Sequence, residues 1–207
     1  CHNFSFLEKY DMLKNVVDGG TFLLTSLYNK DEVWDHLPSR VQKQIIDKKL
    51  KFYIINAFKI AEGIGLGGRI NVIMQTAFFK ISQVIDERVA IDAIKKSVEK
   101  TYGKKGEKIV KMNIQAVDQA LDNIEEVKVP DKFTGKVSEK PIVSESAPDF
   151  VKETTAKLLR REGDKVKVSE MPADGTWPTA TSQYEKRNIA INIPIWNPET
   201  CIQCGKC

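Results

Sequence analysis

Hydrophobic positions follow two different periods along residues 1 to about 128. Short apolar runs bounded by turn-forming residues, at 21–26 and 51–56, are typical of buried strands. Longer stretches carry apolar residues at every third or fourth position, which predicts helices. The predicted helices span residues 4–16, 31–37, 39–49, 70–82, 86–103 and 107–124. Because strands and helices alternate along the chain, we expect an α/β sandwich.

The pattern changes at Val129. The stretch that follows carries prolines, serines and mixed charges without a helical period, which is typical of a linker or an extended segment. A short helix is predicted within residues 149–163. Over residues 189–195 isoleucines alternate with other residues, which predicts a half-buried strand. Because Pro194 cannot donate to a strand ladder, we expect this stretch at a sheet edge or as an arm on another surface.

Charge and hydropathy argue against two kinds of partner. The net charge is +4, from 32 basic and 28 acidic residues that alternate in mixed-sign runs. We therefore expect solvated helix faces and no nucleic-acid-binding stripe. No apolar run approaches the roughly 18–20 residues of a membrane span, so we expect no membrane partner. The chain opens at Cys1, without methionine and already in a dense apolar and charged pattern, and we expect a fragment cut at both ends.

The last seven residues carry the most specific motif. Cys201, Cys204 and Cys207 follow the spacing Cys-x2-Cys-x2-Cys, which is typical of a ferredoxin-type iron–sulfur site. Zinc is the weaker alternative, because zinc sites use two separated Cys-x2-Cys pairs. Such close spacing also argues against a disulfide framework and for a reducing compartment. A fourth ligand is missing, and upstream only Cys1 remains, so we expect no stable cluster in this chain.

A glycine-rich stretch offers a second motif. Gly63, Gly65 and Gly68 match the G-x-G-x-x-G spacing of dinucleotide-binding proteins. That fingerprint directly follows a strand, whereas a helical segment, residues 57–62, precedes these glycines. A nicotinamide-dependent dehydrogenase is therefore a minor alternative. We expect instead that the glycines end one helix and that a second helix begins directly after them. Asn71, in its first turn, either binds a ligand or caps the helix.

Two stretches together identify a family. GLGGRINVIMQTAFFKIS at residues 65–82 and YEKRNIAINIPIWNPETCIQCGKC at residues 184–207 resemble, in this order and at this distance, pyruvate:ferredoxin (flavodoxin) oxidoreductases. The second includes a segment similar to the Glu-Lys-Arg segment that precedes the family's two-cluster ferredoxin domain. The resemblance implies that residues 1–128 are the later part of a gamma-type catalytic domain, a three-layer α/β/α sandwich. It further implies that residues 129–199 form the extended, loop-rich Glu-Lys-Arg region, and that residues 200–207 begin a truncated ferredoxin domain.

The family decarboxylates pyruvate oxidatively on thiamine diphosphate and Mg, yielding acetyl-CoA and CO2. It passes electrons through [4Fe–4S] clusters to ferredoxin or flavodoxin. The resemblance therefore implies an oxidoreductase that acts on a 2-oxoacid. It implies that this chain supplies coenzyme A contacts and domain docking to that enzyme and is inactive alone. The resemblance implies no catalytic residue within this chain. Asn71 and Asn113 are similar to the positions that touch coenzyme A, and Cys201, Cys204 and Cys207 to cluster ligands.

The resemblance also implies partners and a location. The partners are ferredoxin or flavodoxin, other domains of the same chain, and a second copy in a full-length homodimer. The location is the cytoplasm, or a reducing anaerobic organelle if the source is a protist. Two alternatives remain open. One is another 2-oxoacid:ferredoxin oxidoreductase, and the other is a non-catalytic scaffold that holds an electron-transfer domain to its partner.

Overall fold

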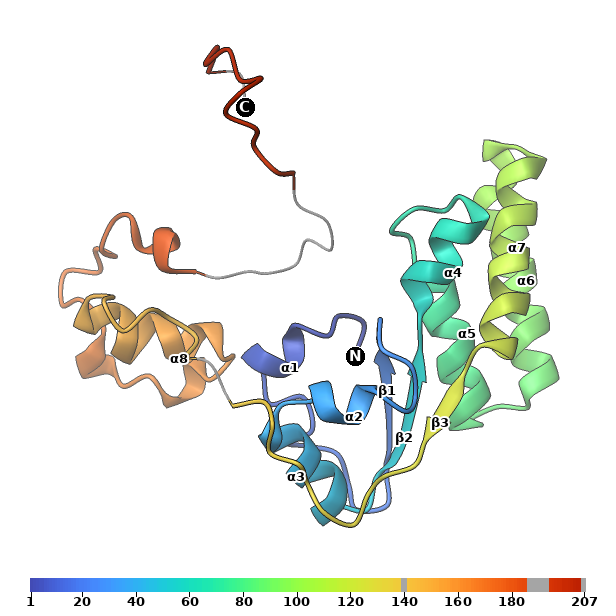
Figure 1. Cartoon of the computed structure of the whole chain (residues 1–207), viewed down its shortest axis with the longest axis horizontal. Helices are drawn as coiled ribbons and strands as arrows, with labels where there is room; N and C mark the ends of the chain where they lie inside the picture. Colours follow the sequence, from blue (N-terminus) through green and yellow to red (C-terminus); the bar gives the residue numbers. More distant parts are fainter. Residues whose placement is uncertain (139–140, 186–193, 206–207) are drawn as a thin grey trace.

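A three-stranded sheet forms the centre of the first part of the chain. The computed structural model describes residues 1–138, 141–185 and 194–205 (Figure 1). The strands are β1 (Thr21–Thr25), β2 (Lys51–Ile55) and β3 (Glu125–Val127), in the spatial order β1-β2-β3. β1 and β2 run parallel, and β3 runs antiparallel to β2.

Helices cover both faces of this sheet. Figure 1 shows α1 to α3 on one side and α4 to α7 on the other. The helices of this part are α1 (Phe6–Lys9), α2 (Val33–His36), α3 (Ser39–Asp47), α4 (Ala57–Ile64), α5 (Asn71–Ser82), α6 (Glu87–Tyr102) and α7 (Glu107–Asp122), with the 3-10 turn η1 (Gly103–Lys105) between the last two.

Alternation along the strands places successive side chains on opposite faces. Phe22 and Leu24 of β1 and Phe52 and Ile54 of β2 share one buried cluster with residues of α1, α2 and α3. The rings of Phe22 and Phe52 stack with their centroids 5.4 Å apart. This face is the larger apolar core, because the aromatic and branched residues that favour strands also fill it.

The opposite face packs against α4, α5 and α7. Ile55 and, partly buried, Leu23 belong to this second cluster, and the Thr25 hydroxyl donates to Met74 Sδ at 2.8 Å. The helices approach closely through fully buried alanines, which are Ala57, Ala61, Ala77, Ala116 and Ala120. α6 packs outside α5 and α7 through a third cluster. The predicted three-layer α/β/α sandwich is confirmed, with α6 as an additional outer helix.

The predicted helix over residues 4–16 is wrong in length, because only Phe6–Lys9 is helical. Side chains from α3 and from its C-cap residue bind the carbonyls that a longer helix would need for itself. Arg40 donates to the carbonyls of Leu7 and Tyr10, at 3.2 and 3.3 Å. Lys48 Nζ donates to three more carbonyls, those of Leu13, Lys14 and Val16. The segment therefore forms irregular turns packed on α3.

The chain start adds a residue to the free edge of β1. The Cys1 amino group donates to the Leu23 carbonyl at 2.6 Å, and the Thr25 amide donates to the Cys1 carbonyl at 2.9 Å. This pair of bonds flanks Leu24 as a residue of a parallel strand would. Burial lowers the pKa of the Cys1 amino group from 8.0 to about 6.

Residues 129–138, here called the return segment, run back from β3 across α2 and α3. Gln42, fully buried, donates through Nε2 to the Trp34 carbonyl at 2.5 Å and to Thr134 Oγ1 at 3.0 Å. Its Oε1 accepts from the amides of Thr134 and Gly135, at 3.0 and 3.2 Å. One buried amide therefore joins the return segment to the core.

Residues 141–185 form a smaller cluster of their own. Its buried residues include Val143, Ala147 and Val151, and no buried residue of this cluster comes from the sandwich. The predicted helix over 149–163 contains a π-helical turn, η2 (Val151–Thr155), followed by α8 (Ala156–Leu159). Three short 3-10 turns follow, η3 (Gly163–Lys165), η4 (Val168–Glu170) and η5 (Thr181–Tyr184). The domain boundaries at 128 and 199 stay predictions.

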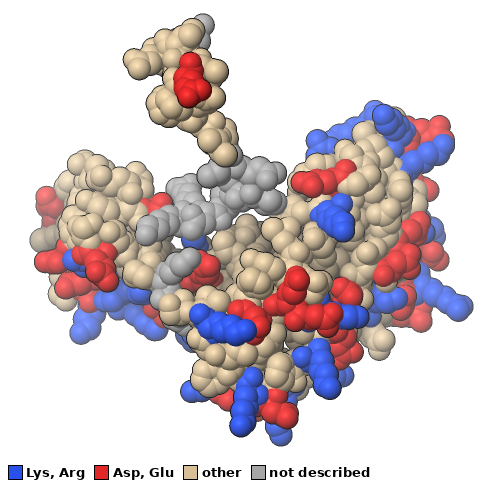
Figure 2. Space-filling model, viewed as in Figure 1, with Lys and Arg blue, Asp and Glu red and all other residues tan. Residues whose placement is uncertain are grey.

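Two expectations about surfaces can be compared with the structure. Figure 2 shows basic and acidic side chains interspersed over the visible face, as the mixed-sign runs predict. Within the described ranges, no helix combines the length and the apolar character needed to cross a bilayer. The predicted strand over 189–195 lies mostly outside the described residues; Ile195, which is described, is 92% exposed.

Candidate functional site

The two asparagines assigned to coenzyme A lie near the same end of the α5–α7 helix pair. Ile70, just before Asn71, and Met112, just before Asn113, belong to one apolar cluster. A Cβ atom added to Gly65 would lie 3.2 Å from Met112 Cε, so the glycine turn packs directly on the first turns of α7. The two positions, 42 residues apart in the sequence, therefore lie on helices that pack against the same apolar cluster.

Asn71 begins α5 and is exposed. The turn before it depends on Gly65 and Gly67, whose φ angles of 86° and 59° lie in the left-handed region that glycine tolerates best. No side-chain hydrogen bond caps this end of α5. The first-turn amides are consequently left for solvent or an anionic ligand, which the helix dipole also favours. The predicted helix start after the glycines is confirmed.

Asn113 is buried, with 5% of its surface exposed. Its Nδ2 donates to the Ile109 carbonyl at 2.8 Å, one turn earlier in α7. That bond fixes the orientation of the amide, and in the part of the chain that the structure describes nothing donates to its Oδ1. Asn113 can therefore act as a hydrogen-bond acceptor in this site, while its amide nitrogen is already engaged.

Basic side chains gather near the start of α7. Lys104, Lys105 and Lys108 are all exposed at the turn between α6 and α7, and Lys105 lies 5.5 Å from the Tyr102 ring centroid. Exposed lysines of this kind attract phosphate through a screened field and hold it only weakly.

The cysteine segment has features suited to thiolate ligands. The Gln203 amide donates to Cys201 Sγ at 3.4 Å. The hydrogen bond from the Trp196 side chain, followed by that amide, lowers the pKa of the Cys201 thiol. Cys204 is exposed, and Cys207 lies outside the described residues. Among the described residues no three metal-ligating side chains come together. The thiol groups are therefore of the type that binds iron–sulfur clusters, but the described residues do not form a ligand cluster.

The remaining two motifs of the sequence are the Glu-Lys-Arg segment and the glycine-rich stretch. Lys186 and Arg187 of the Glu-Lys-Arg segment lie outside the described residues, whereas Glu185 is half-buried. Gly63 lies inside α4, which separates β2 from the glycine turn. The glycines therefore do not follow a strand directly, as the dinucleotide fingerprint requires.

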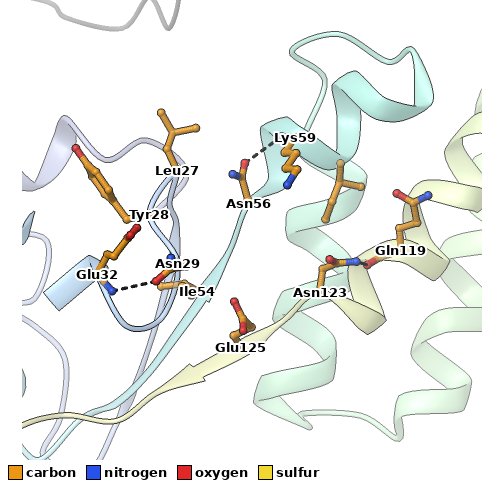
Figure 3. A pocket seen from close by; sticks show the side chains of 11 residues that line it. Leu27, Tyr28, Asn29, Glu32, Ile54, Asn56, Lys59, Gln119, Asn123 and Glu125 are labelled. Atoms are coloured by element: carbon orange, nitrogen blue, oxygen red, sulfur yellow. Dashed lines mark hydrogen bonds between the residues drawn. The ribbon is translucent and has the colours of Figure 1, made fainter.

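The structure also contains a cavity that sequence reasoning missed. It has a volume of about 510 Å³ and lies outside the carboxyl ends of β1 and β2 (Figure 3). None of the four predicted site residues that the structure describes lines it. One signal in the sequence pointed to it: Asn56 is the last residue of the predicted strand over 51–56, and ligands of open α/β sheets bind at the carboxyl ends of the strands.

The structure describes an α/β domain, and three cysteines with the spacing Cys-x2-Cys-x2-Cys follow it in the sequence. A family model for "Pyruvate ferredoxin/flavodoxin oxidoreductase" matches residues 1–123, and a second, named EKR and described as a domain of unknown function, matches residues 136–190. The chain belongs to the pyruvate ferredoxin/flavodoxin oxidoreductase family.

Similar proteins match along the entire chain. It is 50% identical to the pyruvate-flavodoxin oxidoreductase of Trichormus variabilis and 49% identical to that of Rhodospirillum rubrum. It is 48% identical to the pyruvate:ferredoxin oxidoreductase of Moorella thermoacetica. Each match covers 100% of this chain but only 17–18% of the relative. The chain thus spans less than a fifth of the length of these relatives.

Proposed function

We propose that this chain is a piece of an enzyme that oxidatively decarboxylates pyruvate to acetyl-CoA and CO2 and reduces ferredoxin or flavodoxin. Thiamine diphosphate with Mg would supply the decarboxylation chemistry there, and [4Fe–4S] clusters the electron transfer. The chain contributes coenzyme A contacts and domain docking, and it does not turn over alone. The observation that carries the proposal is 48–50% identity over the whole chain with proteins named for this reaction.

Asn71 and Asn113 would hold coenzyme A between the glycine turn and α7. Asn71, exposed at the uncapped start of α5, offers an amide donor beside the first-turn backbone amides, which suits a phosphate oxygen. Asn113, with Nδ2 bonded to Ile109, offers Oδ1 to an amide N–H of the pantetheine arm. The two residues thus take complementary roles, one as donor and one as acceptor.

Cys201, Cys204 and Cys207 would provide thiolates to a cluster completed by a cysteine beyond this chain. The Gln203 amide and the Trp196 side chain both stabilise negative charge on Cys201 Sγ, which favours the ligating form. In the longer protein the partners are ferredoxin or flavodoxin, neighbouring domains and a second copy, in the cytoplasm or a reducing organelle.

Calorimetry with coenzyme A tests the assignment. The 207-residue chain should bind coenzyme A, and Asn71→Ala should weaken binding about five-fold, the equivalent of one hydrogen bond of about 1 kcal/mol. Asn15→Ala, a substitution at an exposed asparagine away from the site, is the matched control. In the whole protein, Asn71→Ala should raise KM for coenzyme A and leave KM for pyruvate unchanged. A folded chain that takes up no coenzyme A, with an unchanged KM in the whole protein, would favour the scaffold alternative.

A further inference from the structure

The cavity at the carboxyl ends of β1 and β2 is built from three separate stretches of the chain. The loop after β1 supplies Tyr28, Asn29 and Glu32, and the first turn of α4 with its cap supplies Asn56 and Lys59. The end of α7 and the start of β3 close it with residues that include Asn123 and Glu125. Its volume of about 510 Å³ lies within the range of small-molecule sites.

Opposite charges stand on opposite walls of this cavity. Figure 3 shows Glu32 on the wall formed by the loop after β1 and Lys59 on the wall formed by α4, with Asn56 between them. Neither charged group has an ion pair or a side-chain hydrogen bond within the described ranges. The third charged residue, Glu125, is already paired with Lys30 at 3.4 Å. The cavity is therefore left with one acidic and one basic group that face it from different sides.

Local hydrogen bonds hold the polar groups of both walls in place. Asn29 Oδ1 accepts from the amides of Asp31 and Glu32, at 3.0 and 3.1 Å, and fixes the loop that carries Glu32. Asn56 Oδ1 accepts from the Lys59 amide at 3.0 Å and caps α4. That bond orients the Asn56 amide and leaves its Nδ2 as a donor beside Lys59. The α4 wall is accordingly rich in donors and suited to a carboxylate.

We propose that this cavity binds a small zwitterion, of the size of an amino acid or a dipeptide. Its carboxylate lies against Lys59 and Asn56, and its ammonium lies against Glu32. A ligand with one charge forms an ionic contact with only one wall and leaves the charged group of the other wall without one, as in the free protein. A polyphosphate is disfavoured, because Glu32 and Glu125 both face the space that it would fill.

Dipeptides with matched charges test the proposal. The 15N-labelled 207-residue chain is titrated with glycylglycine, with N-acetylglycylglycine, which lacks the ammonium, and with glycylglycinamide, which lacks the carboxylate. We expect saturable amide shifts for the lining residues with glycylglycine. Each singly charged form should bind up to about five-fold more weakly, as the loss of one exposed ionic contact implies.

Variants assign each charge to its wall. In Glu32→Gln, glycylglycine and its acetylated form should bind equally; in Lys59→Met, glycylglycine and its amide should bind equally. Glu62→Gln on α4 and Lys51→Met at the other end of β2 carry the same changes at exposed positions outside the cavity, and both should keep the wild-type preference. The proposal is overturned if glycylglycine causes no saturable shift, or if its preference survives both Glu32→Gln and Lys59→Met.

Discussion

Replacing Gln42 by leucine tests how the return segment is held. The substitution keeps the size of a fully buried side chain and removes its amide. The Trp34 carbonyl then loses one of its two donors and keeps the Leu37 amide at 3.2 Å, so this lost bond costs about 0.5–1.5 kcal/mol. The amides of Thr134 and Gly135 lose an acceptor but are exposed and regain water, so each lost bond costs about 0.5–1 kcal/mol. We expect the free energy of unfolding to fall by about 2–3 kcal/mol.

Urea unfolding followed by far-ultraviolet circular dichroism measures this change. Native-state hydrogen exchange locates it, because the amides of Thr134 and Gly135 should lose protection while those of α6 keep theirs. Gln115→Leu removes the same amide from an exposed position on α7 and should leave stability nearly unchanged. If Gln42→Leu unfolds at the wild-type urea concentration, or if protection at Thr134 persists, Gln42 does not hold the return segment.

Two further predictions concern titratable groups. Because the pKa of the Cys1 amino group falls from 8.0 to about 6 on folding, the unfolded chain binds more protons between these values. The free energy of unfolding should therefore drop by about 2 kcal/mol as pH falls from 8 to 6, and N-terminal acetylation should abolish this dependence in denaturant titrations. For Cys201, Trp196→Phe removes the side-chain donor that lowers its thiol pKa, so alkylation by iodoacetamide at neutral pH should slow. Peptide mass spectrometry measures that rate, Trp177→Phe serves as control, and equal rates in all three proteins would contradict the assignment.

The helices and strands that the sequence predicted correctly are those whose own pattern of apolar and turn-forming residues determines them. The apolar runs at β1 and β2 are bounded by turn residues, and Ile91, Ile94 and Val98 mark the buried face of α6. β3 was missed because it has three residues, two of them glutamates, and exists through pairing with β2. The helix over residues 4–16 failed because Arg40 and Lys48, far along the chain, bind its carbonyls.

In the candidate site, too, the sequence predicted the features that local residues determine and missed those that depend on packing. The helix start at Asn71 follows from the glycines before it, whereas the approach of Asn113 depends on how α5 and α7 pack. The cavity could not be predicted as a whole, because its walls come from stretches separated by up to 98 residues, from Leu27 to Glu125. Only the position of Asn56, at the carboxyl end of a predicted strand, carried a local signal. Residues so far apart in the sequence can be recognised as neighbours only once the fold is known.

The alanines between α4, α5, α7 and the sheet have a consequence for ligand geometry. A methyl group is the whole side chain at Ala77 of α5 and at Ala116 and Ala120 of α7, and all three are fully buried. A larger residue at any of them would push one helix outward and widen the gap between Asn71 and Asn113. The space proposed for coenzyme A would therefore depend on three alanines that lie outside its predicted contacts.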